Sequence, residues 1–313
     1  MTVGLRPQSL RSKVAPVSRS GPPMFVFGIG AAKAGTTWLY RYLRAHPECH
    51  LRGHKELNYF DAIDKSMVRF QAERLVAEIR DLQARLPEMA PEKQKQRFHD
   101  MLDMRDFHQV LMTCHADKNA YFRYIMGGLG QQRLVADITP NYASLSTDML
   151  GKMVGVANET RFIYLMRDPV DRFWSNVRMQ ATAKVPVGSD IAEAAKAELA
   201  DILSGQKSPI IEHSDYAEVL EKLDIAIPKD RRLAMFYEDL LTQDGIRRLC
   251  KFLGIKPVMV DFSQRANEGQ SVKMTEDERA AVRRFLRPQY EAVASRFPVL
   301  PKAWQKTMAE GFA

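Results

Sequence analysis

Short apolar runs alternate along this chain with longer segments whose apolar residues recur at helical spacing. The runs lie at residues 24–29, 133–136, 161–166 and 232–236. After the first run, Trp38, Leu39, Tyr42 and Leu43 repeat at the period of a helix, and Pro47 then ends that helix. Strands that alternate with helices predict an α/β protein with a central parallel sheet flanked by helices.

The segment from about 62 to 118 is highly charged, and its apolar residues recur at helical spacing, with interruptions at Pro87 and Pro91. We interpret it as a helical insertion. The stretch from Lys184 to Pro209 holds an Ala-rich helix between Pro, Gly and Ser residues and is a candidate flap. The length of 313 residues and the 45% hydrophobic content are sufficient for one large domain, predicted at 24–313.

Residues 1–23 form a Pro- and Ser-containing lead, which we expect to be disordered, without the apolar run of a signal peptide. No window approaches the roughly 18 apolar residues of a membrane span. The three cysteines lack the paired spacing of a zinc site or a disulfide framework. These features predict a cytoplasmic protein.

The chain has 46 Lys and Arg against 38 Asp and Glu, a net charge of +8. Such a charge suits an anionic ligand, and equally nucleic acid or a membrane surface. Basic residues are interspersed with acidic ones, which argues against a nucleic-acid-binding module. Peripheral membrane contact and the oligomeric state stay open.

A candidate phosphate loop, residues 28–37 (GIGAAKAGTT), joins the first strand to the first helix. Backbone amides and the helix N-terminus can converge there on an anion. Lys33 precedes Gly35 instead of following it, so the Walker A order of kinases and ATPases is absent. Position 33 would be glycine in a dinucleotide-binding loop, so that fingerprint fails as well.

A second candidate motif follows the 161–166 strand, where Arg167 stands at the strand end and Ser175 eight residues later on a helix. An arginine with a hydroxyl suits a terminal phosphate, because guanidinium donates in bidentate fashion and stays charged. The alternative is a structural ion pair between Arg167 and Asp168. Arg172 is assigned a structural or peripheral role, since helical geometry turns its side chain away from at least one of the other two.

Residues 53–60 (GHKELNYF) carry a Lys55-Glu56 pair ahead of two aromatics. Glu56 is a candidate general base, and His54 is its rival. A surface ion pair is the alternative interpretation of Lys55 and Glu56.

Together these motifs resemble the sulfotransferase superfamily, which uses 3′-phosphoadenosine 5′-phosphosulfate (PAPS), and its bacterial and carbohydrate-type members most closely. The resemblance implies a P-loop-NTPase-like fold and PAPS bound through Lys33, Ala34, Gly35, Thr36, Thr37 and Trp38. It implies that Lys33 contacts the 5′-phosphate and the bridging oxygen, and that Arg167 and Ser175 hold the 3′-phosphate. Glu56 would be the base, with Lys55 on the sulfuryl oxygens.

Three weaker assignments follow from the same resemblance. Thr139, Asn141 and Tyr142 are predicted to form an acceptor wall with His54, although Ile138 replaces a lysine of the heparan-type members. Lys273, in the segment 267–273, is predicted near the nucleotide phosphates. Residues 237–240 (YEDL) are assigned to the scaffold.

The sequence thus predicts transfer of a sulfuryl group from PAPS to a hydroxyl or amine, leaving adenosine 3′,5′-bisphosphate, without a metal. The acceptor is a carbohydrate, a lipid headgroup or a small alcohol. A nucleotide-dependent kinase and a non-catalytic nucleic-acid-binding protein are the alternatives.

Overall fold

Five parallel strands form one sheet in the order β2-β3-β1-β4-β5, which confirms the predicted α/β class. The computed structural model describes residues 21–117, 119–186, 188–206, 208, 210, 215–260, 262 and 272–312, so most of the predicted N-terminal lead lies outside it. The strands are β1 (Met24–Gly30), β2 (Cys49–His50), β3 (Leu134–Ile138), β4 (Thr160–Met166) and β5 (Arg232–Phe236).

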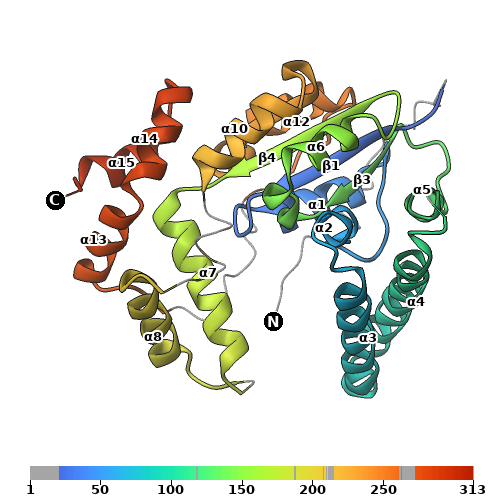
Figure 1. The fold of residues 1–313 in the computed structure, drawn as a ribbon, viewed down its shortest axis with the longest axis horizontal. Coiled ribbons are helices and arrows are strands. Elements are labelled where there is room, and N and C mark those ends of the chain that lie inside the picture. Colours follow the sequence, from blue (N-terminus) through green and yellow to red (C-terminus); the bar gives the residue numbers. More distant parts are fainter. Residues whose placement is uncertain are drawn as a thin grey trace.

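Helices cover both faces of this sheet (Figure 1). Parallel crossovers are right-handed, so a helix that leads from β1 toward the β2 edge lies on the opposite face from helices that lead toward β5. The first group is α1 (Thr36–Ala45), joined by α12 (Gln243–Leu253) through a 3.2 Å contact between Tyr42 and Cys250. The second contains α6 (Thr147–Val154) and α10 (Tyr216–Ala226), which pack together.

Two helical projections extend from the same side of the sheet (Figure 1). One is the pair α3 (Val68–Arg85) and α4 (Pro91–Thr113), linked by η2 (Leu86–Glu88), so Pro87 lies between the two helices and Pro91 begins the second. The other is α7 (Pro169–Lys184) with α8 (Ala192–Leu203) packed against it. The candidate flap 184–209 therefore contains α8, and an ion pair joins Lys184 to Glu198 of that helix.

The remaining elements connect these layers. Two of them, η3 (Pro140–Ser144) and α11 (Tyr237–Leu240), follow a strand closely, where they position side chains at the carboxyl edge of the sheet. The others are α2 (Tyr59–Asp64), α5 (Ala120–Met126), η4 (Lys229–Arg231), α13 (Glu276–Phe285), α14 (Arg287–Arg296) and α15 (Lys302–Ala309).

Candidate functional site

The loop between β1 and α1 leaves the start of α1 open to an anion. Gly35 is the N-cap residue of α1, with φ of 94°, and it has no side chain to cap the helix. The first turn of α1 holds no acidic residue. The first amides of a helix have no partner within the helix, so they are available to an external acceptor. Of the other predicted loop residues, Ala34 and Thr36 are buried and Thr37 is exposed. Trp38 stacks between Tyr42 and Phe262.

Tyr237 ties this loop to the second predicted motif. A Cβ atom at Gly35 would lie 2.4 Å from Cδ2 of Tyr237, so the ring occupies the space beside this glycine. The guanidinium of Arg167 lies 5.4 Å from the centroid of the same ring, within cation–π range. Tyr237, which the sequence assigned to the scaffold, thus lies between the two predicted motifs and is a further candidate residue of the site. Its place directly after a strand, where ligands bind in parallel sheets, is the sequence signal that indicates it.

The backbone of Arg167 is fixed from α10. The Tyr216 hydroxyl lies 3.0 Å from the Arg167 amide nitrogen and 2.7 Å from its carbonyl oxygen. Asp168 accepts hydrogen bonds from the backbone of α7 and, at 2.9 Å, from the hydroxyl of Tyr290. The Asp168 carboxylate is therefore hydrogen-bonded to groups other than Arg167. This excludes the structural ion pair considered for Arg167 and Asp168.

One face of α7 is turned toward Lys33. Nζ of Lys33 lies 3.8 Å from Sδ of Met179, and Arg178 acts electrostatically on the same ammonium. Ser175 precedes these two residues by three and four positions, and side chains at that spacing share one helix face. Arg172 is fully buried with its guanidinium 5.2 Å from the ring centroid of Tyr216, in agreement with its predicted structural role.

The C-terminal part of the predicted site lies against α7 as well. The indole nitrogen of Trp174 donates a 2.8 Å hydrogen bond to the carbonyl of Val272. Lys273 is the next residue and is exposed. This bond brings the chain before α13 to the residue adjacent to Ser175. The rest of the predicted segment, 267–271, lies outside the described residues.

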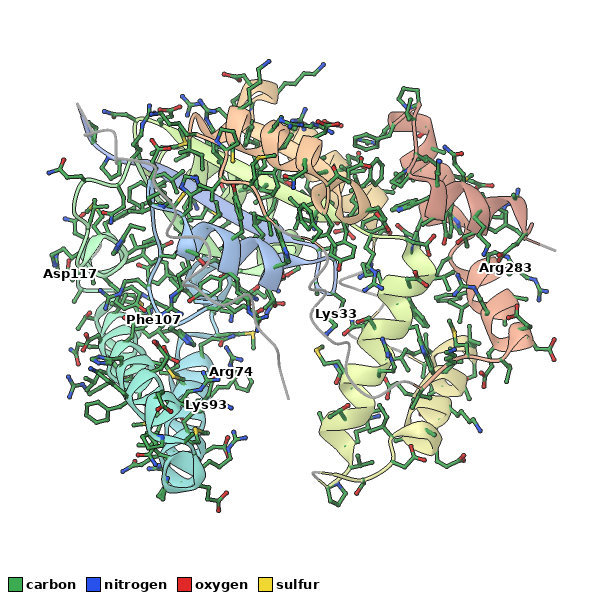
Figure 2. All side chains as sticks on the ribbon, turned by 180° about the vertical axis from the view of Figure 1, so that it is seen from behind. Lys33, Arg74, Lys93, Phe107, Asp117 and Arg283 are labelled. Carbon is green, nitrogen blue, oxygen red and sulfur yellow. The ribbon has the colours of Figure 1, made fainter. Side chains whose placement is uncertain are left out.

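Lys33 is the electrostatic centre of the site. Burial lowers the pKa of its ammonium, and the positive charges of Arg178, Arg167 and Lys55 lower it further, while Glu56 raises it. Figure 2 shows Lys33 between the two helical projections. Cations from the loop, from the end of β4 and from α7 thus converge with one carboxylate, an arrangement that suits an anion with several negative oxygens.

Glu56 is the accessible acid of this group. Its side chain is 47% exposed and forms an ion pair with Lys55. His54, the rival base, packs against Phe107 with 5.9 Å between ring centroids, and burial lowers its pKa to about 4. The His54 ring is thus neutral at pH 7 but packed into the interior, whereas the Glu56 carboxylate is open to an incoming acceptor, which favours Glu56 as the base.

The segment that carries Glu56 is anchored from two helices. The hydroxyl of Tyr40 in α1 lies 2.8 Å from the carbonyl oxygens of both Arg52 and Gly53. Asp103 of α4 accepts a 2.8 Å hydrogen bond from the backbone amide of His54. The helical insertion therefore supports the segment that precedes Glu56.

A third anchor comes from the corner after β3. Glu56 and Asn58 have φ values of 62° and 53°, a region that costs free energy for residues other than glycine. The Asn58 side chain donates to the Glu56 carbonyl at 2.7 Å, and its Oδ1 accepts a 2.9 Å hydrogen bond from Asn141. The amide of Tyr59 donates to the hydroxyl of Tyr142 at 3.1 Å.

Contrary to the prediction, Thr139 and Tyr142 do not present their hydroxyls to an acceptor substrate. Both are fully buried, and they donate to the carboxylate of Asp137 at 2.7 and 2.8 Å, beside Tyr121 at 2.9 Å. Burial raises the pKa of Asp137, and these hydrogen bonds oppose the shift. The cluster supports the Glu56 segment through the hydrogen bond between Tyr142 and the Tyr59 amide. Asn141 supports the same segment through its hydrogen bond to Asn58.

Two features are absent from the described part of the chain. It contains no group of three or more His, Cys, Asp or Glu residues placed to hold a metal ion. None of its helices combines the length and the apolar character needed to cross a membrane. Cys49, Cys114 and Cys250 are buried, and none of them forms a disulfide within the described residues.

Known proteins resemble this chain in sequence profile and in fold. A sequence profile described as the Sulfotransferase family matches residues 23–258. The crystal structure of a sulfotransferase from Alicyclobacillus acidocaldarius is similar, with a TM-score of 0.58 and 19% identity over 91% of this chain and 99% of that one. No curated protein sequence matches.

Two more distant structures cover similar shares of the chain. The sulfotransferase domain of the Synechococcus PCC 7002 olefin synthase gives a TM-score of 0.37 at 16% identity, covering 95% of this chain and 94% of that one. The sulfotransferase domain from the curacin biosynthetic pathway gives 0.41 at 15%, covering 94% and 98%. The profile match spans the loop at Lys33, the Glu56 segment and the Arg167 motif. The chain belongs to the sulfotransferase family.

Proposed function

We propose that this protein transfers a sulfuryl group from PAPS to a hydroxyl or amine, with Glu56 as the base. The observation that carries the proposal is the convergence on Lys33, where three other cations and the carboxylate of Glu56 act on one ammonium. A polyanionic donor needs the cations, and an acceptor needs a base beside them.

Residues on both sides of Tyr237 fit the two phosphates of the donor. The uncapped start of α1 suits the 5′-phosphate, and Gly35 lets the loop pass close to the Tyr237 ring, which a Cβ would meet. Arg167, Ser175 and Lys273 are proposed to hold the 3′-phosphate. When bound, the donor supplies a sulfuryl group joined to a good leaving group, a phosphate oxygen.

The roles of the side chains follow from where charge develops. The acceptor oxygen or nitrogen bonds to sulfur while the bond between sulfur and the phosphate oxygen breaks. Lys33 stabilises the negative charge that grows on that departing oxygen. Glu56 takes the proton that the acceptor loses, and Lys55 neutralises charge on the sulfuryl oxygens. Anchoring of the Glu56 segment contributes by holding the base in position.

The acceptor is proposed to be a carbohydrate, a lipid headgroup or a small alcohol, in the cytoplasm. The proposed chemistry assigns no step to a metal ion, since cations and amides of the protein cover the donor. A nucleic acid partner is not expected.

Calorimetric titration with adenosine 3′,5′-bisphosphate tests the donor site. We expect Lys33→Ala and Arg167→Ala to weaken binding about 10- to 100-fold each, the equivalent of losing charge-assisted hydrogen bonds of roughly 1.5–3 kcal/mol. Lys152→Ala, an exposed cation of α6, is the matched control. Preference for ATP with Mg²⁺, or no binding of the bisphosphate, would restore the kinase alternative.

A further inference from the structure

A second hollow lies on the sheet beneath α10, away from the Lys33 site. Its volume is about 410 Å³. The floor is formed by Ile29, Phe162 and Tyr164, and Leu220 and Leu223 of α10 form a wall. Pockets for small molecules commonly have about 300–1,000 Å³ and mostly apolar linings. The volume of this hollow falls within that range, and most of its lining residues are apolar.

The hollow shares no lining residue with the proposed donor and base residues. The strand register explains how its floor forms. Phe162 pairs with Arg232, and Tyr164 pairs with Ala234, so these four residues share one face of β4 and β5. Arg232 begins β5, whereas Tyr237 follows the end of that strand. The rim at Arg232 and the proposed donor site thus lie toward opposite ends of the same strand.

The rim of the hollow is basic. Four cations line it against one acid, Asp224, and they are Lys229, Arg232, Arg248 and Arg296. Asp224 forms ion pairs with both Arg232 and Arg296. Lys229 and Arg248 are exposed and form no ion pair within the described residues. Arg248 uses one donor on the carbonyl of Ala234, at 3.3 Å, and keeps its other donors for a ligand.

We propose that this hollow binds an amphipathic anion, a medium-length alkyl chain that ends in a carboxylate. The apolar floor and the α10 wall take the chain, and Lys229 and Arg248 take the headgroup. A buried alkyl chain gains affinity with each methylene removed from water, and a guanidinium offers two parallel donors to a carboxylate. A polar sugar or a nucleotide base would find few hydrogen-bonding groups on this floor.

Calorimetric titration with decanoate, octanoate and decanol tests the proposal on the full chain. Decanoate is expected to bind roughly 15-fold more tightly than octanoate, because two methylenes contribute about fourfold each. Decanol, which lacks the charge, should bind more weakly than decanoate. Failure to detect decanoate binding, or equal affinity for decanol, overturns the proposal.

Two variants locate the site. Lys229→Ala with Arg248→Ala should weaken decanoate binding at least tenfold, while Lys251→Ala with Lys302→Ala, which removes the same charge at exposed positions outside the lining, should leave it unchanged. Leu223→Trp should fill the hollow and abolish binding, with a circular dichroism spectrum as the check of folding. Undiminished binding to the Leu223→Trp variant, once folded, would place decanoate elsewhere and overturn the proposal. If that variant does not fold, the charge variants decide alone.

Discussion

The side-chain amide of Asn141 donates a 2.9 Å hydrogen bond to Oδ1 of Asn58, and Asn58 in turn donates to the carbonyl of Glu56. Two residues at positive φ are thereby held by a side chain from the corner after β3. Backbone strain of this kind persists only where the surroundings over-determine it, and it is concentrated at functional sites. Asn141 is therefore a positioning residue for the proposed base.

Replacing Asn141 by alanine should reduce turnover more than donor binding. The buried Oδ1 of Asn58 would lose its partner, at a cost of about 1–3 kcal/mol in the free energy of unfolding. Displacement of Glu56 by a fraction of an ångström is expected to lower kcat by roughly tenfold or more. Urea unfolding and steady-state rates measure the two effects, and the affinity for adenosine 3′,5′-bisphosphate should stay within about twofold. A matching loss of that affinity would show that Asn141 acts on the donor site instead.

Gly35→Ala should damage the donor loop for two separable reasons. The residue sits at φ of 94°, which costs an L-amino acid on the order of 1–2 kcal/mol, and the new Cβ would meet the Tyr237 ring. We expect lower stability and weaker binding of adenosine 3′,5′-bisphosphate, measured by thermal unfolding and calorimetry.

Gly151→Ala in α6 is the matched control for this substitution. A Cβ there meets nothing within 4 Å, and the helix should gain about 0.5–1 kcal/mol. A double variant that combines Gly35→Ala with Tyr237→Ala should recover only the part of the lost stability and affinity that is due to the clash. Full retention of bisphosphate affinity in Gly35→Ala alone would contradict the proposed placement of the phosphate.

The sheet could be predicted from sequence because its longer strands are mostly apolar. All five residues of β3 are buried, and the predicted run 161–166 falls within β4. A parallel sheet covered on both faces gives such continuous runs. The strand β2 was missed because it has only two residues, Cys49 and His50, too few for any periodicity.

Site residues could be predicted from sequence only where the chemical groups stand in a short contiguous motif. Lys33, Arg167 and Glu56 stand in motifs that can be read along the chain, and the structure brings them within electrostatic reach. Thr139 and Tyr142 were misassigned because their direction depends on Asp137, whose burial is a property of the assembled fold. A hydroxyl looks the same in sequence whether it faces solvent or a buried carboxylate.

Glu56→Gln should abolish most of the turnover while leaving the donor site intact. The amide cannot take a proton, and general-base catalysis typically contributes about 10²- to 10⁴-fold to a rate. Rates are measured with any acceptor that the parent protein sulfates, and binding of adenosine 3′,5′-bisphosphate is the control for folding. A parallel His54→Gln variant should retain substantial activity. The reverse order of effects would assign the base to His54.

Stability should fall as the pH drops from about 6.5 to about 4, in part because of His54. Burial lowers the pKa of this imidazole from 6.5 to about 4. Across that window the unfolded chain binds more protons than the folded chain, so acid favours unfolding, and the full shift corresponds to about 3 kcal/mol. Urea unfolding at several pH values should show a shallower loss for His54→Gln than for the parent, whereas His99→Gln, an exposed histidine of α4, should follow the parent. Identical slopes for all three proteins would mean that His54 is solvated enough to keep its ordinary pKa, which would contradict the burial that favours Glu56 over His54 as the base.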